Sequence, residues 1–161
     1  MVVISDTSVI SNLYQIGQLS LLEHLFTAVV IPPTVLQELY ADPNQADLLD
    51  KAPWITVRSP QDQRLIQQLL NELDLGEAEA IVLAIEQKAD LLLIDEAKGR
   101  AVAEKYTLTI TGVLGLLIQG KKTGYLSEVR VHIIALRKLG FRLSLRLVNK
   151  VLAKIEEQPI S

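Results

Sequence analysis

The chain has 161 residues, 49% hydrophobic and 22% charged, which predicts one globular domain with a full core rather than a disordered chain. It has no cysteine and only two histidines, which excludes disulfides and zinc sites built on Cys or on clustered His. Its net charge is −3, and it shows neither an apolar run of membrane-spanning length nor a signal-peptide pattern at its start, so we expect a cytoplasmic protein with no membrane partner.

The charge is unevenly distributed along the chain. Residues 1–120 carry 7 Lys and Arg against 16 Asp and Glu, whereas residues 121–161 carry 9 against 3. A basic tail on an acidic body is compatible with binding of a polyanion. It is equally compatible with the solvated faces of amphipathic helices.

The first predicted element is a short buried strand. Val2, Val3 and Ile4 form an apolar, β-branched run without polar alternation, which is typical of a central parallel strand. Asp6 follows at the carboxyl end of this strand, where open α/β sheets bind their ligands. The alternative is that Asp6 or Ser8 only caps the next helix.

The remaining pattern alternates between strands and helices. Strands are predicted at 28–31, 54–57 (an edge strand), 91–94 and 108–111, and helices at 11–17, 20–26, 34–41, 44–51, 60–72, 78–87, 97–105, 112–120, 127–139 and 144–156. Such alternation predicts an α/β fold, a parallel sheet with helices on both faces, in a single domain over 1–161.

Two predicted strands end on a carboxylate, Asp6 after the first and Asp95 after residues 91–94. If these strands are neighbours, both acids line one crevice. Glu38 lies in the middle of an amphipathic helix, where an exposed structural role is the alternative.

A further acid lies on an almost entirely apolar helix. Glu79 is flanked there by Ala78 and Ala80, and an acid on a buried helix is costly unless a partner satisfies it. Glu77 is explained by a capping box with Asp74. The two glutamates cannot share a helix face, so we select Glu79.

Four carboxylates in one cleft would repel each other by roughly 4 kcal/mol for a pair about 4 Å apart at an intermediate dielectric. Proteins resolve such repulsion by raising pKa values or by binding a cation. Oxygen ligands without Cys suit Mg²⁺ or Mn²⁺.

Several ordered segments together resemble the PIN-domain superfamily, in particular short prokaryotic PIN-like proteins related to VapC toxins. These segments are Ile4–Ser8, Ile31–Leu39, Leu75–Ala84, Leu91–Glu96 and Thr111–Gly112, which span nearly the whole chain. The resemblance implies a three-layer α/β/α sandwich around a parallel sheet. It also implies a Mg²⁺- or Mn²⁺-dependent endoribonuclease that uses a metal-activated water, homodimers and, for the toxins, a small antitoxin partner.

The resemblance also implies the site residues. Asp6 and Asp95 would hold the metal most directly, Glu38 and Glu79 would complete the site and orient the water, and Thr7 or Ser8 would support Asp6. The chain departs from the family in having Leu93 where many PIN nucleases have threonine, and Glu79 where many have aspartate. Arg100 would contact a phosphate or pair with Glu96 at four-residue spacing.

The tail has one regular basic pattern. Arg142, Arg146 and Lys150, followed by Lys154, recur every four residues and would form a stripe on a helix, opposite an apolar face of Leu143, Leu147, Val151 and Ile155. The stripe would contact an RNA backbone, bind an acidic antitoxin, pair subunits or simply be solvated.

Two other function classes remain beside the nuclease. One is a PIN-like fold that is catalytically inactive and serves as an RNA- or protein-binding module. The other is Mg²⁺-dependent phosphotransfer, which is disfavoured because Ser8 stands where dehalogenase-type phosphatases carry their second aspartate.

Overall fold

The computed structural model describes all of residues 1–161 and separates into two compact units, Met1–Val113 and Leu114–Ser161. The first unit contains the sheet and the second contains helices only. The single domain over 1–161 stays a prediction. No helix in either unit combines the length and the apolar character that crossing a membrane requires.

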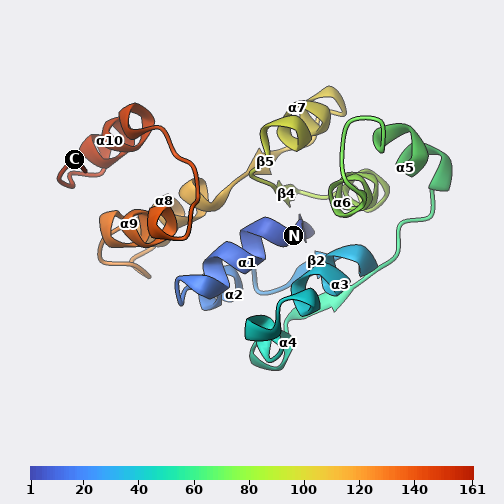
Figure 1. Cartoon of the computed structure of the whole chain (residues 1–161), viewed down its shortest axis with the longest axis horizontal. Helices are drawn as coiled ribbons and strands as arrows, with labels where there is room; N and C mark the ends of the chain where they lie inside the picture. The colour runs from blue at the N-terminus through green and yellow to red at the C-terminus, as the bar shows by residue number, and fades with distance from the viewer. The chain divides into compact units, whose positions relative to one another are not determined.

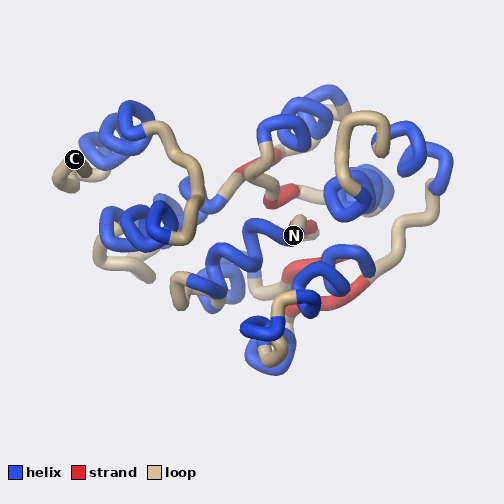
Figure 2. Tube along the Cα trace, in the orientation of Figure 1, coloured by secondary structure: helices blue, strands red, loops and turns tan.

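The first unit alternates strands and helices as predicted (Figures 1 and 2). Its elements are β1 (Val3–Ser5), α1 (Thr7–Gln15), α2 (Ser20–Phe26), β2 (Val29–Ile31), α3 (Pro33–Ala41), a 3₁₀ turn (Pro43–Gln45), α4 (Leu48–Lys51), β3 (Ile55–Val57), α5 (Gln63–Leu69), α6 (Leu75–Glu86), β4 (Leu91–Leu93), α7 (Ala97–Lys105) and β5 (Ile110–Thr111).

The five strands form one parallel sheet in the order β3-β2-β1-β4-β5. β1 is central, and its residues Val3, Ile4 and Ser5 are all buried, as its lack of polar alternation predicted. β3 lies at an edge, which is also confirmed. Helices flank the sheet, and this agrees with the predicted α/β/α fold.

The order of the strands reverses direction once. From β1 the chain adds β2 and β3 on one side, and it then returns to add β4 and β5 on the other. α6 packs against β1 and β4, and α3 contacts both α1 and α6. The reversal makes the carboxyl ends of β1 and β4 the switch point at which such sheets bind ligands.

Helix starts differ from the predictions where a side-chain cap acts earlier than expected. α1 begins at Thr7 rather than 11 because the Asp6 carboxylate accepts the N–H of Val9. α6 begins at Leu75 rather than 78 because the Asp74–Glu77 capping box is complete.

The second unit consists of the last three helices and the chain that joins them. α8 (Val113–Lys122) starts at the last residue of the first unit, and α9 (Arg130–Lys138) and α10 (Leu145–Lys154) follow. The apolar face predicted for α10 is wrong at Leu147, which is 49% exposed, whereas Leu143, Val151 and Ile155 are half-buried. The fully buried residues are Val148 and Leu152, so the buried face is centred one position further along the helix.

Glu157 connects separate segments of the second unit. Its carboxylate, 8% exposed, pairs with Lys121 at 2.7 Å and accepts the backbone N–H groups of Val129 (2.8 Å) and Arg130 (2.7 Å). Burial alone would raise the pKa of Glu157, but Lys121 and the two N–H groups together lower it. The charged form of Glu157 is therefore the form that stabilises the folded unit.

We expect Glu157→Ala to lower the free energy of unfolding by about 3 kcal/mol at pH 7, because it leaves Lys121 and two N–H groups without their acceptor. Since the folded pKa lies below the unfolded one, the contribution is present above about pH 4.5 and is lost as pH falls further. Urea unfolding at pH 7 and pH 3 measures both effects, with Glu128→Ala as the exposed control. Equal losses at both pH values would contradict the assignment.

Candidate active site

Asp6 lies at the end of β1 and is 3% exposed. Its carboxylate accepts the N–H of Val9 at 3.2 Å, and the Ser8 hydroxyl approaches it at 3.3 Å. The predicted capping role and the predicted place at the strand end are therefore both correct, because the same side chain fills them. The resemblance implied that Thr7 or Ser8 supports Asp6, and of the two it is Ser8 whose hydroxyl lies next to the Asp6 carboxylate.

Glu38 extends from α3 toward the start of α1. The Thr7 hydroxyl donates to its Oε1 at 2.9 Å, so Thr7 supports Glu38 rather than Asp6. A Cβ atom added at Gly76 would lie 2.1 Å from the same oxygen, which places the carboxylate directly against the first turn of α6. The side chain thus has a defined position although α3 leaves it exposed.

Asp6 and Glu38 line a cleft of about 500 Å³ at the carboxyl ends of the strands. The lining consists of Asp6, Thr7, Ser8, Ser11, Asn12, Glu38, Asp74, Glu77, Glu96 and Lys98. Five of these side chains are carboxylates and one is an ammonium group, so the cleft is strongly acidic.

The structure brings Glu77, not Glu79, to the cleft. Glu79 accepts the backbone N–H of Thr34 at 3.1 Å, near the start of α3, and it does not line the cleft. The expectation that the two glutamates face different directions is correct, but the choice between them is not supported. Glu77 lines the cleft and completes the capping box at the same time, so the structural explanation did not exclude a functional one.

Asp95 comes close to Asp6 because β1 and β4 are neighbouring strands. This was the condition for the two strand-end acids to lie together. Its carboxylate accepts the N–H of Val113 at 3.1 Å and does not line the cleft. Arg100 donates from Nη1 to the carbonyl oxygen of Ile94 at 3.0 Å. Arg100 does not line the cleft and forms no ion pair with Glu96, so the predicted pairing is not seen, and the phosphate contact stays a prediction.

Burial and mutual repulsion shift these carboxyl groups toward their neutral forms. Burial, with the charges of Asp95 and Glu77 adding to it, raises the pKa of Asp6 from 3.8 to about 8. Burial likewise raises the pKa of Glu77 from 4.5 to about 7, and it raises the pKa values of Glu38 and Asp95. Such shifts are characteristic of functional acids.

The donor chemistry of the cleft fits a hard divalent cation, since every acidic ligand is a carboxylate oxygen and a cation would relieve the repulsion. The geometry of the cleft does not yet form a complete metal site, because no three acidic or histidine side chains converge on one point that could hold an ion. Holding an ion would therefore require rotation of at least one carboxylate.

Four charged residues of the cleft were not predicted: Asp74, Glu77, Glu96 and Lys98. The signal for Asp74 and Glu77 was present, because their capping box lies at the start of α6, which the fold places at the carboxyl ends of the strands. For Glu96 the signal was its position directly after Asp95, and for Lys98 it was its position in the first turn of α7.

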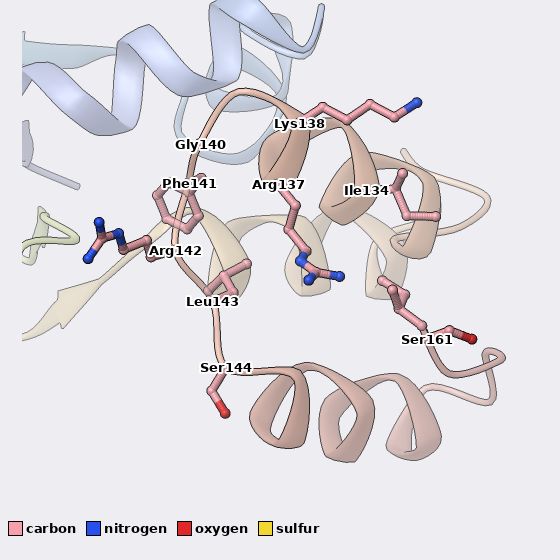
Figure 3. A pocket seen from close by; sticks show the side chains of 10 residues that line it. Ile134, Arg137, Lys138, Gly140, Phe141, Arg142, Leu143, Ser144 and Ser161 are labelled. Carbon is pink, nitrogen blue, oxygen red and sulfur yellow. The ribbon is translucent and has the colours of Figure 1, made fainter.

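The second unit has a separate hollow of about 820 Å³ between α9 and α10 (Figure 3). Arg137, Lys138 and Arg142 line it together with apolar side chains, and the lining contains no Asp or Glu. Arg137 extends from α9 toward α10. Of the predicted RNA contacts, Arg142 lines this hollow from the connection before α10, whereas Arg146 and Lys150 are exposed on α10 and lie outside the hollow.

Three comparisons with known proteins show what the chain is similar to. A search of the curated proteins finds no match. A solved structure, a PilT N-terminus domain protein of the hyperthermophilic archaeon Sulfolobus solfataricus P2, is 19% identical; the match covers 74% of this chain and 92% of that one, with a TM-score of 0.47. The profile of the family DUF3368, described as a PIN domain, matches residues 2–157. With nearly its whole length inside that match, the chain belongs to the DUF3368 family of PIN domains.

Proposed function

We propose that this PIN domain is a Mg²⁺- or Mn²⁺-dependent endoribonuclease. PIN domains are generally nucleases and bind nucleic acids, so the chain has a nuclease fold as a member of this family. One observation supports the metal-dependent cleavage of RNA: the carboxylates of Asp6, Glu38 and Glu77 line one cleft at the switch point of the sheet. Raised pKa values at all three indicate a site built to accept positive charge.

Each cleft residue has a role in this proposal. Asp6 and Glu38, with Asp95 or Glu96, would hold the cation, which when bound neutralises a phosphodiester and acidifies a water molecule. Glu77 lines the cleft beside these residues, and its carboxylate would take a proton from the attacking water. Lys98 lies at the same cleft with an ammonium group that would bind a phosphate oxygen.

The test is cleavage of a labelled mixture of single-stranded RNA by the purified protein with Mn²⁺, with Mg²⁺ and with EDTA. Cleavage that requires the ion and is absent in Asp6→Asn is expected. The variant keeps an oxygen that can accept the Val9 N–H, so the start of α1 is preserved. Cleavage that persists in EDTA would contradict the metal requirement, and full activity in Asp6→Asn would contradict the site.

The second candidate is an inactive RNA- or protein-binding module. It is favoured by the absence of three acids arranged around one point. It predicts RNA binding that survives Asp6→Asn, together with no cleavage under any metal condition. The same assay therefore separates the two functions.

The biological role that we attach to the nuclease is that of a toxin with a small antitoxin partner, acting as a homodimer. Its support is the resemblance of the chain to VapC-related proteins, and apolar side chains exposed on the second unit, such as Val131 and Leu139, offer surface for a partner. Induced expression should arrest growth for the native chain and not for Asp6→Asn, and light scattering reports the oligomeric state.

RNA contacts are proposed for the hollow of the second unit, on the basis of Arg137 and Arg142 and the absence of lining carboxylates. In Asp6→Asn protein held in EDTA, adding Arg137→Ala or Arg142→Ala should weaken RNA binding. Each should also reduce the slope of log affinity against log salt by about 0.7, because one phosphate contact is lost. Lys122→Ala, exposed and outside the hollow, is the matched control. A salt slope that is unchanged in both arginine variants would exclude RNA contacts at this hollow.

A further inference from the structure

Two glycines, Gly76 and Gly112, lie against carboxylates of the candidate site and lack a side chain for a reason other than backbone conformation. Gly17, Gly124 and Gly140 have positive φ and nothing within 4 Å of an added Cβ, so each is required by its turn. Gly76 and Gly112 differ from these three glycines in both respects. Neither has a positive φ, and the space that a Cβ would need is already occupied by other atoms. The backbone at these two positions would accept alanine.

The nearest atom to each space belongs to an acid, and at Gly112 the Nη1 atom of Arg100 follows at 3.1 Å. A Cβ at Gly76 would lie 2.1 Å from Oε1 of Glu38, and a Cβ at Gly112 would lie 2.1 Å from Oδ1 of Asp95. Both distances are far shorter than any real Cβ contact, so the carboxylate would have to move. The two glycines lie in different parts of the chain. Gly76 contacts the carboxylate of Glu38 from α3, and Gly112 contacts the carboxylate of Asp95, which follows β4.

Hydrogen bonds hold each carboxylate in its space. The Thr7 hydroxyl donates to Oε1 of Glu38 at 2.9 Å, the same oxygen that touches the Gly76 position. The N–H of Val113, the residue after Gly112, donates to Oδ1 of Asp95 at 3.1 Å. Displacing either carboxylate would break the bond that orients it.

We infer that Gly76 and Gly112 are positioning residues, whose missing side chains leave the spaces in which the carboxylates of Glu38 and Asp95 are held in place. This inference rests on the proposed function for its catalytic consequence, but the placement itself is a property of the fold. Gly76 lies in the first turn of α6, where alanine is the better helix former. A merely structural glycine and a positioning glycine therefore predict different results on substitution.

The primary test is Gly76→Ala, measured by thermal unfolding, by Mn²⁺ affinity from electron paramagnetic resonance, and by RNA cleavage. The melting temperature should be unchanged or slightly higher, because helix propensity rises and Glu38 is an exposed side chain that can turn away. Mn²⁺ affinity and cleavage should each fall about 10- to 100-fold, the usual cost of losing the support of a ligand.

The control repeats Gly76→Ala in a protein that also carries Glu38→Asp. Its carboxylate is one methylene shorter and leaves room for the alanine methyl group, so adding Gly76→Ala there should change Mn²⁺ affinity and cleavage by less than about threefold. A purely structural role for Gly76 would carry the same penalty in both backgrounds. Gly112→Ala is the second variant, and it should weaken Mn²⁺ binding because Asp95 loses the Val113 N–H.

A crystal structure of Gly76→Ala makes failure of the inference distinguishable from failure of the proposed function. The inference is supported if Glu38 has left Thr7, even in a protein that cleaves nothing. It is overturned if the Thr7–Glu38 contact is kept, or if a cleaving native protein loses neither Mn²⁺ affinity nor activity on the substitution. Native protein that neither binds Mn²⁺ nor cleaves RNA overturns the proposed function alone.

Discussion

Asp6→Asn should abolish cleavage and, in EDTA at pH 8, make the protein more stable than the native chain. The expectation follows from the environment of Asp6, which is 3% exposed and lies among other carboxylates. Burial, first, and the charges of Asp95 and Glu77 raise its pKa from 3.8 to about 8. Without a cation, the ionised carboxylate is a destabilising group in this site.

The direction of the pH dependence follows from linkage. A carboxyl group whose folded pKa is raised contributes stability that is complete below its unfolded pKa and is lost as pH rises toward the folded pKa. Native protein in EDTA should therefore lose stability between about pH 4 and pH 8, by up to about 5 kcal/mol from Asp6 alone. An asparagine does not ionise and avoids this loss, while its side-chain oxygen still accepts the Val9 N–H.

Urea unfolding of both proteins in EDTA from pH 4 to pH 8 measures the effect. The stability difference should be small at pH 4 and should grow in favour of Asp6→Asn toward pH 8. Asp62→Asn is the control, because Asp62 caps α5 in the same way but is exposed. A native protein that remains the more stable of the two at pH 8 would contradict the proposed electrostatics of the cleft.

Glu77→Gln should reduce cleavage at least about 100-fold, whereas Glu79→Gln should leave it within about threefold of the native rate. Glu77 lines the cleft, where its carboxylate would accept a proton in the reaction. Glu79 accepts the N–H of Thr34, and a glutamine oxygen can take over that bond. The two residues are two positions apart on one helix, so each variant is a control for the other.

The measurement is the cleavage rate at saturating RNA and Mn²⁺ from pH 5.5 to pH 8.5. The native rate should rise with pH through the pKa of the proton-accepting group, and this rise should be absent from whatever activity Glu77→Gln retains. Native activity in Glu77→Gln together with its loss in Glu79→Gln would restore the assignment that sequence spacing favoured.

Local patterns determined most of the architecture. Apolar β-branched runs bounded by turn residues predict the strands, because a strand buried on both faces can hold little else, and β1 is buried throughout. The lone alternating run at 54–57 correctly predicts an edge strand. Asp6 and Asp95 could be placed at strand ends from the same runs, and the ordered motifs were sufficient to indicate the PIN family.

Only the tertiary structure decided which acids share the cleft. Helical spacing shows that Glu77 and Glu79 point apart, but not which direction leads to the cleft, because that depends on how α6 packs against β1 and α3. Glu77 was set aside for a related reason, its capping role. Asp6 and Glu77 satisfy helix N–H groups and also line a cleft, since the helices that they cap begin at the carboxyl ends of the strands, and a local role and a ligand-binding role coincide there.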